Sequence, residues 1–123
     1  MALAHSPKII TDGLVLCLDA GDRKSYSGSG TTWSDRSGNG YNATLNNGPT
    51  FNSANGGSID FDGSNDYASI AYSTDFQPSD FTIQAWVNLD VFENEDYFVY
   101  RHKTWFIGFS QLGTTFEGGV RDD

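Results

Sequence analysis

Positive charge is scarce in this sequence. Seven Lys and Arg residues stand against sixteen Asp and Glu residues, which leaves a formal net charge of −9 over 123 residues. Nucleic-acid binding depends on clustered Lys and Arg side chains that neutralise phosphates, and anionic membrane surfaces attract the same clusters. The only adjacent cations are Arg23 and Lys24. We therefore expect neither nucleic acid nor a membrane surface among the partners.

Cysteine and long apolar runs are also lacking. The single cysteine, Cys17, excludes an intramolecular disulfide and a multi-cysteine zinc site, and its apolar surroundings at 14–18 predict a buried thiol. No apolar run approaches the ~20 residues of a membrane-spanning helix. Residues 1–7 do not show the apolar stretch of a secretory signal. We expect no signal peptide and no transmembrane segment.

Helical periodicity is almost absent, and an alternation with period two takes its place. In residues 81–89, apolar side chains occupy every odd position and mostly polar ones every even position. This pattern predicts a central strand. Trp86 on its polar side fits a half-exposed surface for a sugar or a core position between two covered faces, and we expect the core position. We expect further strands at 13–19, 58–62, 67–72, 97–101, 105–110 and 115–120.

Turn-forming residues separate these strands. Gly, Asn, Ser and Asp are concentrated at 25–30, 35–40, 46–49, 52–57 and 62–66. Many short strands with regular turn signals indicate an all-β fold, an antiparallel β-sandwich or jelly roll. We expect one such domain over 13–123, preceded by an N-terminal arm over 1–12.

Five blocks of the sequence occur in an order that points to a known family. They are GLVLCLDAG (13–21), SGTTWSDRSGNG (29–40), ATLNNGPTF (43–51), GGSIDFDGSNDYA (56–68) and FTIQAWV (81–87). This succession resembles the laminin-G-like branch of the concanavalin A-like lectin/glucanase superfamily. The residues of these blocks are also similar to those of domains in virion structural proteins of tailed bacteriophages.

The resemblance implies two curved antiparallel sheets, and in many members a carbohydrate site on or beside the concave face. It also implies several more strands after Val87 before the domain closes, and residues 116–123 do not match the usual closing segment. We therefore expect a sandwich abbreviated at its C-terminus or completed by a neighbouring chain, with open strand edges.

Catalysis is not expected. The glucanases of the superfamily carry their carboxylates as Glu-x-Asp-x-x-Glu. With Glu93 in the first position, Glu95 replaces the Asp and Phe98 replaces the second Glu. A retaining glycosidase needs two carboxyl groups ~5–5.5 Å apart, and this segment is better interpreted as a solvated turn. We assign no catalytic residue.

Calcium is the one cofactor for which the sequence offers ligands. Asp35, Ser37 and Asn39 occupy positions 1, 3 and 5 of a calcium-type loop with Gly40 at position 6, but Asn46 stands where a bidentate Glu is required. A second oxygen-rich turn contains Asp62 and Asp66, and Asp19 could lie near either loop. Asx-turns explain both segments without an ion.

Aromatic side chains provide the remaining candidates. Stacking on a sugar ring requires an exposed aromatic face with polar groups around it. The candidates for a carbohydrate site are Trp33, Tyr41 and Trp105, although Trp33 also fits a core position. Aromatic side chains along a predicted hairpin indicate a protein–protein interface. Its candidate residues are Tyr97, Phe98, Tyr100, Trp105 and Phe106.

The resemblance implies a structural component of a bacteriophage virion, a capsid decoration or a tail-associated protein, and the missing catalytic pattern predicts that it is non-enzymatic. Its partners would be other virion proteins and further copies of the chain, with glycan adhesion as an additional property. The alternative is a carbohydrate-binding lectin or adhesin module.

Overall fold

The computed structural model of the chain describes residues 9–90, 97–101, 105–109 and 116–120, with side chains for 9–90 and 98–101. The chain divides into two compact units, Met1–Asp80 and Phe81–Asp123. Among the described residues, the regular elements are eight short strands and two 3-10 turns, so the fold class is all-β as predicted. None of the helices in the described ranges is long and apolar enough to cross a bilayer.

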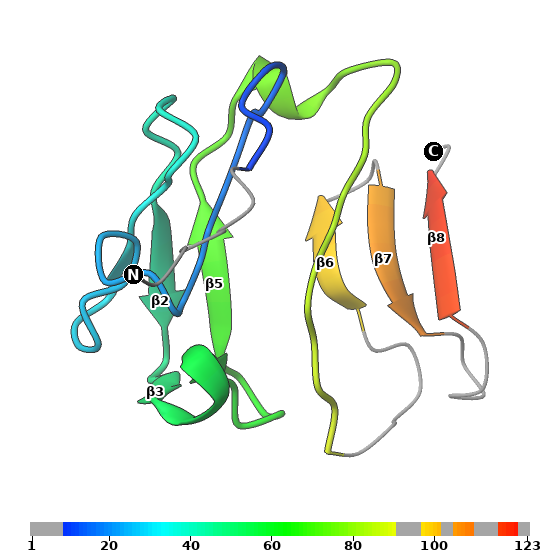
Figure 1. Ribbon diagram of the computed structural model, residues 1–123. Helices are drawn as coiled ribbons and strands as arrows, with labels where there is room; N and C mark the ends of the chain where they lie inside the picture. The colour runs from blue at the N-terminus through cyan, green and yellow to red at the C-terminus, as the bar shows by residue number, and fades with distance from the viewer. Residues whose placement is uncertain (1–8, 91–96, 102–104, 110–115, 121–123) are drawn as a thin grey trace, which may run out of the picture. The chain divides into compact units, whose positions relative to one another are not determined.

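The first unit contains a three-stranded antiparallel sheet and a small hairpin (Figure 1). The sheet has the order β1–β2–β5, and the hairpin pairs β3 with β4. Their bounds are β1 Thr32–Trp33, β2 Ala43–Asn46, β3 Thr50–Asn52, β4 Ser58–Asp60 and β5 Tyr67–Ile70. Two 3-10 turns follow β3 and β5, η1 at Ala54–Gly56 and η2 at Thr74–Phe76.

Strand β2 carries the apolar face of this sheet. Ala43 and Leu45 are buried, with 1% and 4% of their surfaces exposed, whereas Thr44 between them is exposed. The register sets Ala43 opposite Ile70 and Leu45 opposite Ala68. Because side chains alternate across a strand, one face of the β2–β5 pair is apolar and the other is polar.

A buried tyrosine joins the loop before β1 to the hairpin. The Tyr26 ring lies 5.6 Å from the ring of Phe51 on β3, and its hydroxyl donates to the Gly30 carbonyl at 2.8 Å. Ser25 is also buried and donates its hydroxyl to the Ser34 carbonyl at 2.6 Å. Both buried hydroxyls therefore have hydrogen-bond partners, which removes the cost of desolvating them.

The second unit contains an antiparallel meander, β6–β7–β8 (Figure 1). Its strands are β6 Tyr97–Arg101, β7 Trp105–Phe109 and β8 Phe116–Val120. The register shifts between Tyr97 and Val99, so β6 carries a β-bulge at Phe98. A bulge of this kind bends its strand and redirects the side chains around it.

The predicted strands at 58–62, 67–72, 97–101, 105–110 and 115–120 are confirmed as β4 to β8, with small shifts at their ends. The predicted strand at 13–19 is wrong, because residues 14–19 belong to no strand. This apolar segment is held mainly by side-chain hydrogen bonds from a neighbouring loop. The short strands β1, β2 and β3 were not predicted.

The predicted strand at 81–89 is also wrong, because residues 81–90 lie in none of the strands. The burial predicted for Trp86 fails with it, since 92% of that side chain is exposed. Alternation shows that a segment has one apolar side, but a strand also needs a neighbouring strand to supply hydrogen bonds.

A close backbone contact fixes the turn at 19–22 against the turn at 54–57. A Cβ atom on Gly21 would lie 2.4 Å from the Gly56 carbonyl oxygen, and one on Gly57 would lie 3.0 Å from the Ala20 carbonyl oxygen. Real Cβ atoms do not approach a backbone oxygen at 2.4 Å. The turn therefore accepts only glycine at position 21.

We predict that Gly21→Ala lowers the free energy of unfolding by about 1–3 kcal/mol, because the added methyl group forces the two turns apart. Urea denaturation measures the change. Ser53→Ala is the matched control at the same turn, because Ser53 is exposed and makes no side-chain capping bond. Equal stability of the two variants would contradict the contact.

Candidate functional site

The carboxylate of Asp35 is the most heavily bonded side chain of the predicted sites. Its Oδ1 accepts from the backbone N–H groups of Cys17 at 3.0 Å and Ser37 at 2.8 Å. Its Oδ2 accepts from the Ser37 hydroxyl at 2.6 Å and the Tyr41 N–H at 3.1 Å. A carboxylate has about four lone-pair positions, so these four donors use its capacity.

Asn39 and Ser37 extend this network to the apolar segment. The Asn39 side-chain amide donates to the carbonyls of Leu14 and Val15, each at 3.0 Å. The Ser37 hydroxyl also lies 3.0 Å from the Val15 carbonyl and accepts from the Asn39 N–H at 3.2 Å. We call Asp35, Ser37 and Asn39 together the Asp35 clasp, because they hold segment 14–17 against the loop.

The electrostatics of Asp35 follow from this bonding. Partial burial raises the pKa of Asp35, but the hydrogen bonds from Ser37, Cys17 and Tyr41 lower it by more, so the pKa lies below its ordinary value. The side-chain oxygens of Asp35 and Ser37 bond to the loop itself and to segment 14–17, and Asn39 bonds to that segment through its amide nitrogen. Within the described ranges, no group of three His, Cys, Asp or Glu side chains could hold a metal ion. Calcium binding at Asp35, Ser37, Asn39, Asp62 or Asp66 stays a prediction.

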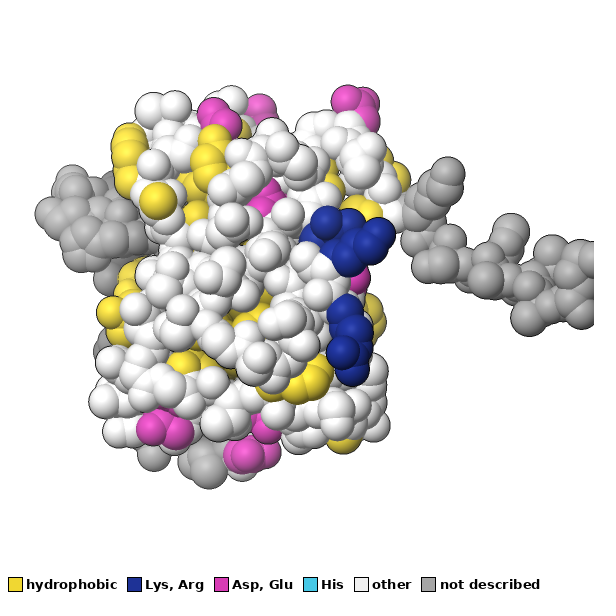
Figure 2. All heavy atoms as spheres, turned by 90° about the vertical axis from the view of Figure 1, so that its left-hand side faces the viewer, with side chains coloured by type: hydrophobic (Ala, Val, Ile, Leu, Met, Phe, Trp, Pro, Cys, Tyr) yellow, Lys and Arg dark blue, Asp and Glu magenta, His cyan; other side chains and the backbone are white. Residues whose placement is uncertain are grey.

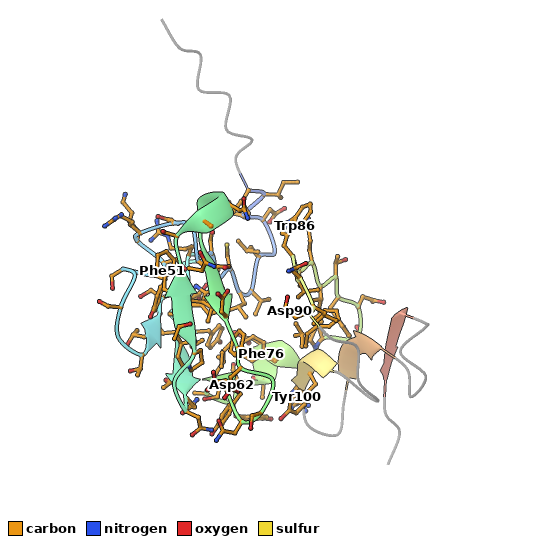
Figure 3. All side chains as sticks on the ribbon, turned by 90° about the horizontal axis from the view of Figure 1, so that it is seen from below. Phe51, Asp62, Phe76, Trp86, Asp90 and Tyr100 are labelled. Carbon is orange, nitrogen blue, oxygen red and sulfur yellow. The ribbon has the colours of Figure 1, made fainter. Side chains whose placement is uncertain are left out.

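The second oxygen-rich loop closes on itself in the same way. Asp62 Oδ1 accepts from the N–H groups of Ser64 at 2.9 Å, Asn65 at 3.2 Å and Asp66 at 3.3 Å. These bonds, that from Ser64 first, lower the pKa of Asp62 below its ordinary value. Asp66 Oδ2 in turn accepts from the Asp62 N–H at 3.1 Å. The loop is a set of Asx-turns (Asp62 is labelled in Figure 3).

Cys17 lies half-buried beside the clasp. Burial first, and then the charges of Asp19 and Asp35, raise the pKa of its thiol. A raised pKa keeps the sulfur in its protonated, weakly nucleophilic form. Asp19 uses one of its carboxylate oxygens for the Gly21 N–H at 2.8 Å. The group suits a structural role better than nucleophilic chemistry.

Tyr41 is fixed by both its hydroxyl and its ring. The hydroxyl bonds to Asp75 Oδ2 at 2.5 Å and to Ser73 Oγ at 2.9 Å. The ring lies 4.9 Å from that of Phe76 with the planes tilted by 56°. The half-buried side chain therefore ties the loop before β2 to η2, and its role at a carbohydrate site stays a prediction.

Trp33 and Trp105 complete the predicted carbohydrate site. Trp33 lies half-buried on β1, and its Nε1 is buried without a hydrogen-bond partner in the described part of the chain. An indole that buries its N–H is better suited to packing than to an exposed sugar platform. Trp105 lies on β7, and its side chain is outside the described set.

Trp86 is the most exposed of the large hydrophobic side chains in the described residues (Figure 3). Gln84 and Asn88, two positions to either side, are exposed as well. An accessible indole next to two amides is the arrangement that sugar stacking requires. Sequence reasoning considered this residue but placed it in the core, because alternation alone did not show whether the second face is covered.

Part of the predicted interface can be located. Tyr100 on β6 is 66% exposed, and Phe98 at the bulge is half-buried. The register sets Tyr100 opposite Phe106 on β7. The side chains of Tyr97, Phe106 and Trp105 lie outside the described set, as do Glu93 and Glu95 of the turn considered for catalysis.

Charged side chains are sparse on the face shown in Figure 2. Acidic groups occupy its upper and lower parts, and Lys and Arg are confined to one edge. Arg36 forms an ion pair with Asp22 at 3.1 Å, with both side chains well exposed. Exposed pairs of this kind contribute only ~0–1 kcal/mol. The described side chains on this face form no broad basic surface.

Comparison of the chain with protein-family models, with curated proteins and with solved structures found no match.

We predict that Asp35→Asn lowers the free energy of unfolding at pH 7 by about 1–3 kcal/mol. With an amide nitrogen in place of Oδ2, a donor would face the two donors that now bond to this oxygen, the Ser37 hydroxyl and the Tyr41 N–H. These groups would then lose their acceptor. Asp12→Asn is the matched control, because Asp12 is exposed. Urea denaturation of the two variants and the wild type makes the comparison.

The same protein should lose stability in acid. A carboxyl whose pKa is lowered by folding stabilises the native state fully above its unfolded pKa of ~3.9, and this contribution disappears as the pH falls toward the lower folded value. Stability should therefore decrease below about pH 4. Asp35→Asn should show a smaller decrease than Asp12→Asn. Identical pH profiles for these two variants would contradict the role of Asp35.

Proposed function

We propose that this chain is a non-enzymatic interaction module that serves as a structural component of a tailed-bacteriophage virion, at the capsid surface or the tail. We further propose that it folds as a laminin-G-like jelly roll of the concanavalin A-like type. It acts through contacts with other virion proteins and with further copies of itself. The five sequence blocks similar to phage virion domains support the assignment.

Exposed hydrophobic side chains in the second unit carry the proposal. Tyr100, Trp86 and Val87 expose 66%, 92% and 49% of their surfaces. Aromatic side chains are enriched at protein–protein interfaces, where their large surfaces become buried. The two exposed aromatic rings and the exposed Val87 of this unit are better explained by a protein partner than by solvent.

Open strand edges support the same proposal. In the first unit β5 pairs only with β2, and in the second unit β6 and β8 each pair only with β7, among the described strands. An edge strand presents backbone donors and acceptors to any strand that approaches it. Strand addition is a common way in which such edges bind another chain.

The chemistry of the candidate residues favours binding over catalysis. Asp35 bonds to its own loop and to the backbone of Cys17, Asp62 bonds to its own loop, and the Cys17 thiol has a raised pKa. A glycosidase needs one carboxyl group with a raised pKa, whereas the pKa values of Asp35 and Asp62 are lowered. These features support a structural role.

We predict that the chain is present in purified phage particles in a fixed stoichiometry, as measured by quantitative mass spectrometry. Tyr100→Asp should weaken binding of the purified chain to particles at least tenfold, because a charge at an interface centre must be desolvated. Tyr72→Asp is the matched control, because Tyr72 is 72% exposed in the first unit. Absence of the chain from particles would refute the virion role.

The lectin alternative is favoured by one observation, the exposure of Trp86 between Gln84 and Asn88. We predict that Trp86→Ala folds normally and changes the free energy of unfolding by less than about 0.5 kcal/mol, as exposed substitutions usually do. Glycan-array binding by the wild type, lost in Trp86→Ala and kept in Trp86→Phe, would establish the lectin. Tyr72→Ala, which removes another exposed ring, is the control.

A further inference from the structure

The segment at 82–90 has the composition of a strand without belonging to one. It contains Thr, Ile, Trp and Val, no Gly or Pro, and a single charge at Asp90, within a chain of net charge −9. Uncharged, alternating segments of this kind pair readily with other strands. In the described structure the segment lies outside every sheet, and its central side chain, Trp86, is 92% exposed.

We propose that residues 82–90 pair antiparallel with the same residues of a second copy of this chain, with Trp86 opposite its counterpart. The inference rests on the proposed function, which requires protein–protein contacts, and it names one of the partners. The interface would be isologous, so that each contact occurs twice around a two-fold axis.

The lengths of the available edges favour a second copy as the partner. The described strands at sheet edges span two to five residues, from β1 with two to β6 and β8 with five. None of them matches a segment of nine residues. A second copy offers a segment of equal length, so that the backbone groups of the whole stretch can be paired.

The side-chain pattern selects the register. With Trp86 at the centre, Ile83 lies opposite Leu89 and Ala85 opposite Val87, while Gln84 meets Asn88 as an amide pair. Apolar side chains thus share one face, and two indoles share the other, as favourable cross-strand pairs do.

The neighbouring registers are less favourable. A centre at Ala85 places Asp80 opposite Asp90, and like charges directly opposite one another are destabilising. A centre at Gln84 places Leu89 opposite Ser79 and loses the contact between Ile83 and Leu89. In a register where Trp86 pairs with Ala85 or Val87 of the second copy, apolar side chains would lie opposite polar ones.

Single cysteines can test both the pairing and the register. In a Cys17→Ser background, each of three substitutions places a cysteine opposite the same cysteine of the second copy in one register only. These are Trp86→Cys, Ala85→Cys and Gln84→Cys. Opposed residues of an antiparallel pair have Cα atoms ~4.5–5.5 Å apart, which suits a disulfide. After mild oxidation, we expect a covalent dimer for Trp86→Cys, at a yield at least tenfold above that of the exposed control Ser29→Cys. Preferential cross-linking at position 84 or 85, or equal yields at all positions, would overturn the proposal.

Sedimentation of the unmodified chain provides a second measurement. At tens of micromolar we expect twice the mass of one chain. Val87→Pro should restore the single mass with an unchanged far-ultraviolet spectrum, because proline cannot donate to a ladder, and Val87→Thr should remain dimeric. A wild type that stays monomeric would refute the pairing. A dimer that is absent from phage particles would refute the virion role alone, so the two proposals fail separately.

Discussion

The first unit depends on one carboxylate. Asp35 joins the backbone of Cys17 to the backbone of Ser37 and Tyr41, and segment 14–17 has no strand ladder to hold it. Tyr41 then extends the connection to η2 through its hydroxyl and its ring. Segment 14–17, the loop at 35–41 and η2 are thereby connected, the first two through the ionised Asp35 and the last through Tyr41. A charged acceptor suits this role, because hydrogen bonds to a carboxylate are stronger than those to a neutral group.

The sequence predicts the class of the fold well and its individual strands unevenly. Strands β4 to β8 arise from runs of alternating or aromatic residues flanked by turn formers, which is the pattern that sequence analysis recognises. Strands β1 and β3 span two and three residues, too few to show a period. The segment at 81–89 alternates and the segment at 13–19 contains a continuous apolar run, yet neither has a ladder. Their apolar sides are visible in the sequence, but the presence of a neighbouring strand is not.

The sequence predicts the members of the candidate site and the Asx-turns of its loop, but not the contact of that loop with segment 14–17. Asp35, Ser37 and Asn39 do come together, as their spacing predicts, because every second residue of a tight loop can point to the same centre. The same spacing serves a calcium loop and a set of Asx-turns. What the sequence does not show is the part played by segment 14–17, about twenty residues earlier in the chain. The backbone carbonyls of that segment accept hydrogen bonds from the Ser37 hydroxyl and the Asn39 side-chain amide. For Trp86 the sequence does not show whether another part of the protein covers the side of the segment on which this residue lies. Burial depends on such a covering element.

The bond between Tyr41 and Asp75 has a consequence for the order of folding. It connects residues 34 apart in sequence and encloses the strands β2 to β5. Closing so large a loop from the unfolded chain would cost considerable entropy. The β2–β5 ladder pairs Ala43 with Ile70 and thus brings the two ends together beforehand. Only a few residues between each end of the ladder and Tyr41 or Asp75 remain to be ordered. We therefore expect the hydrogen bond from the Tyr41 hydroxyl to Asp75 to form after the ladder. Tyr41 therefore belongs to the late steps of folding, and changes there should act on the rate of unfolding more than on the rate of folding.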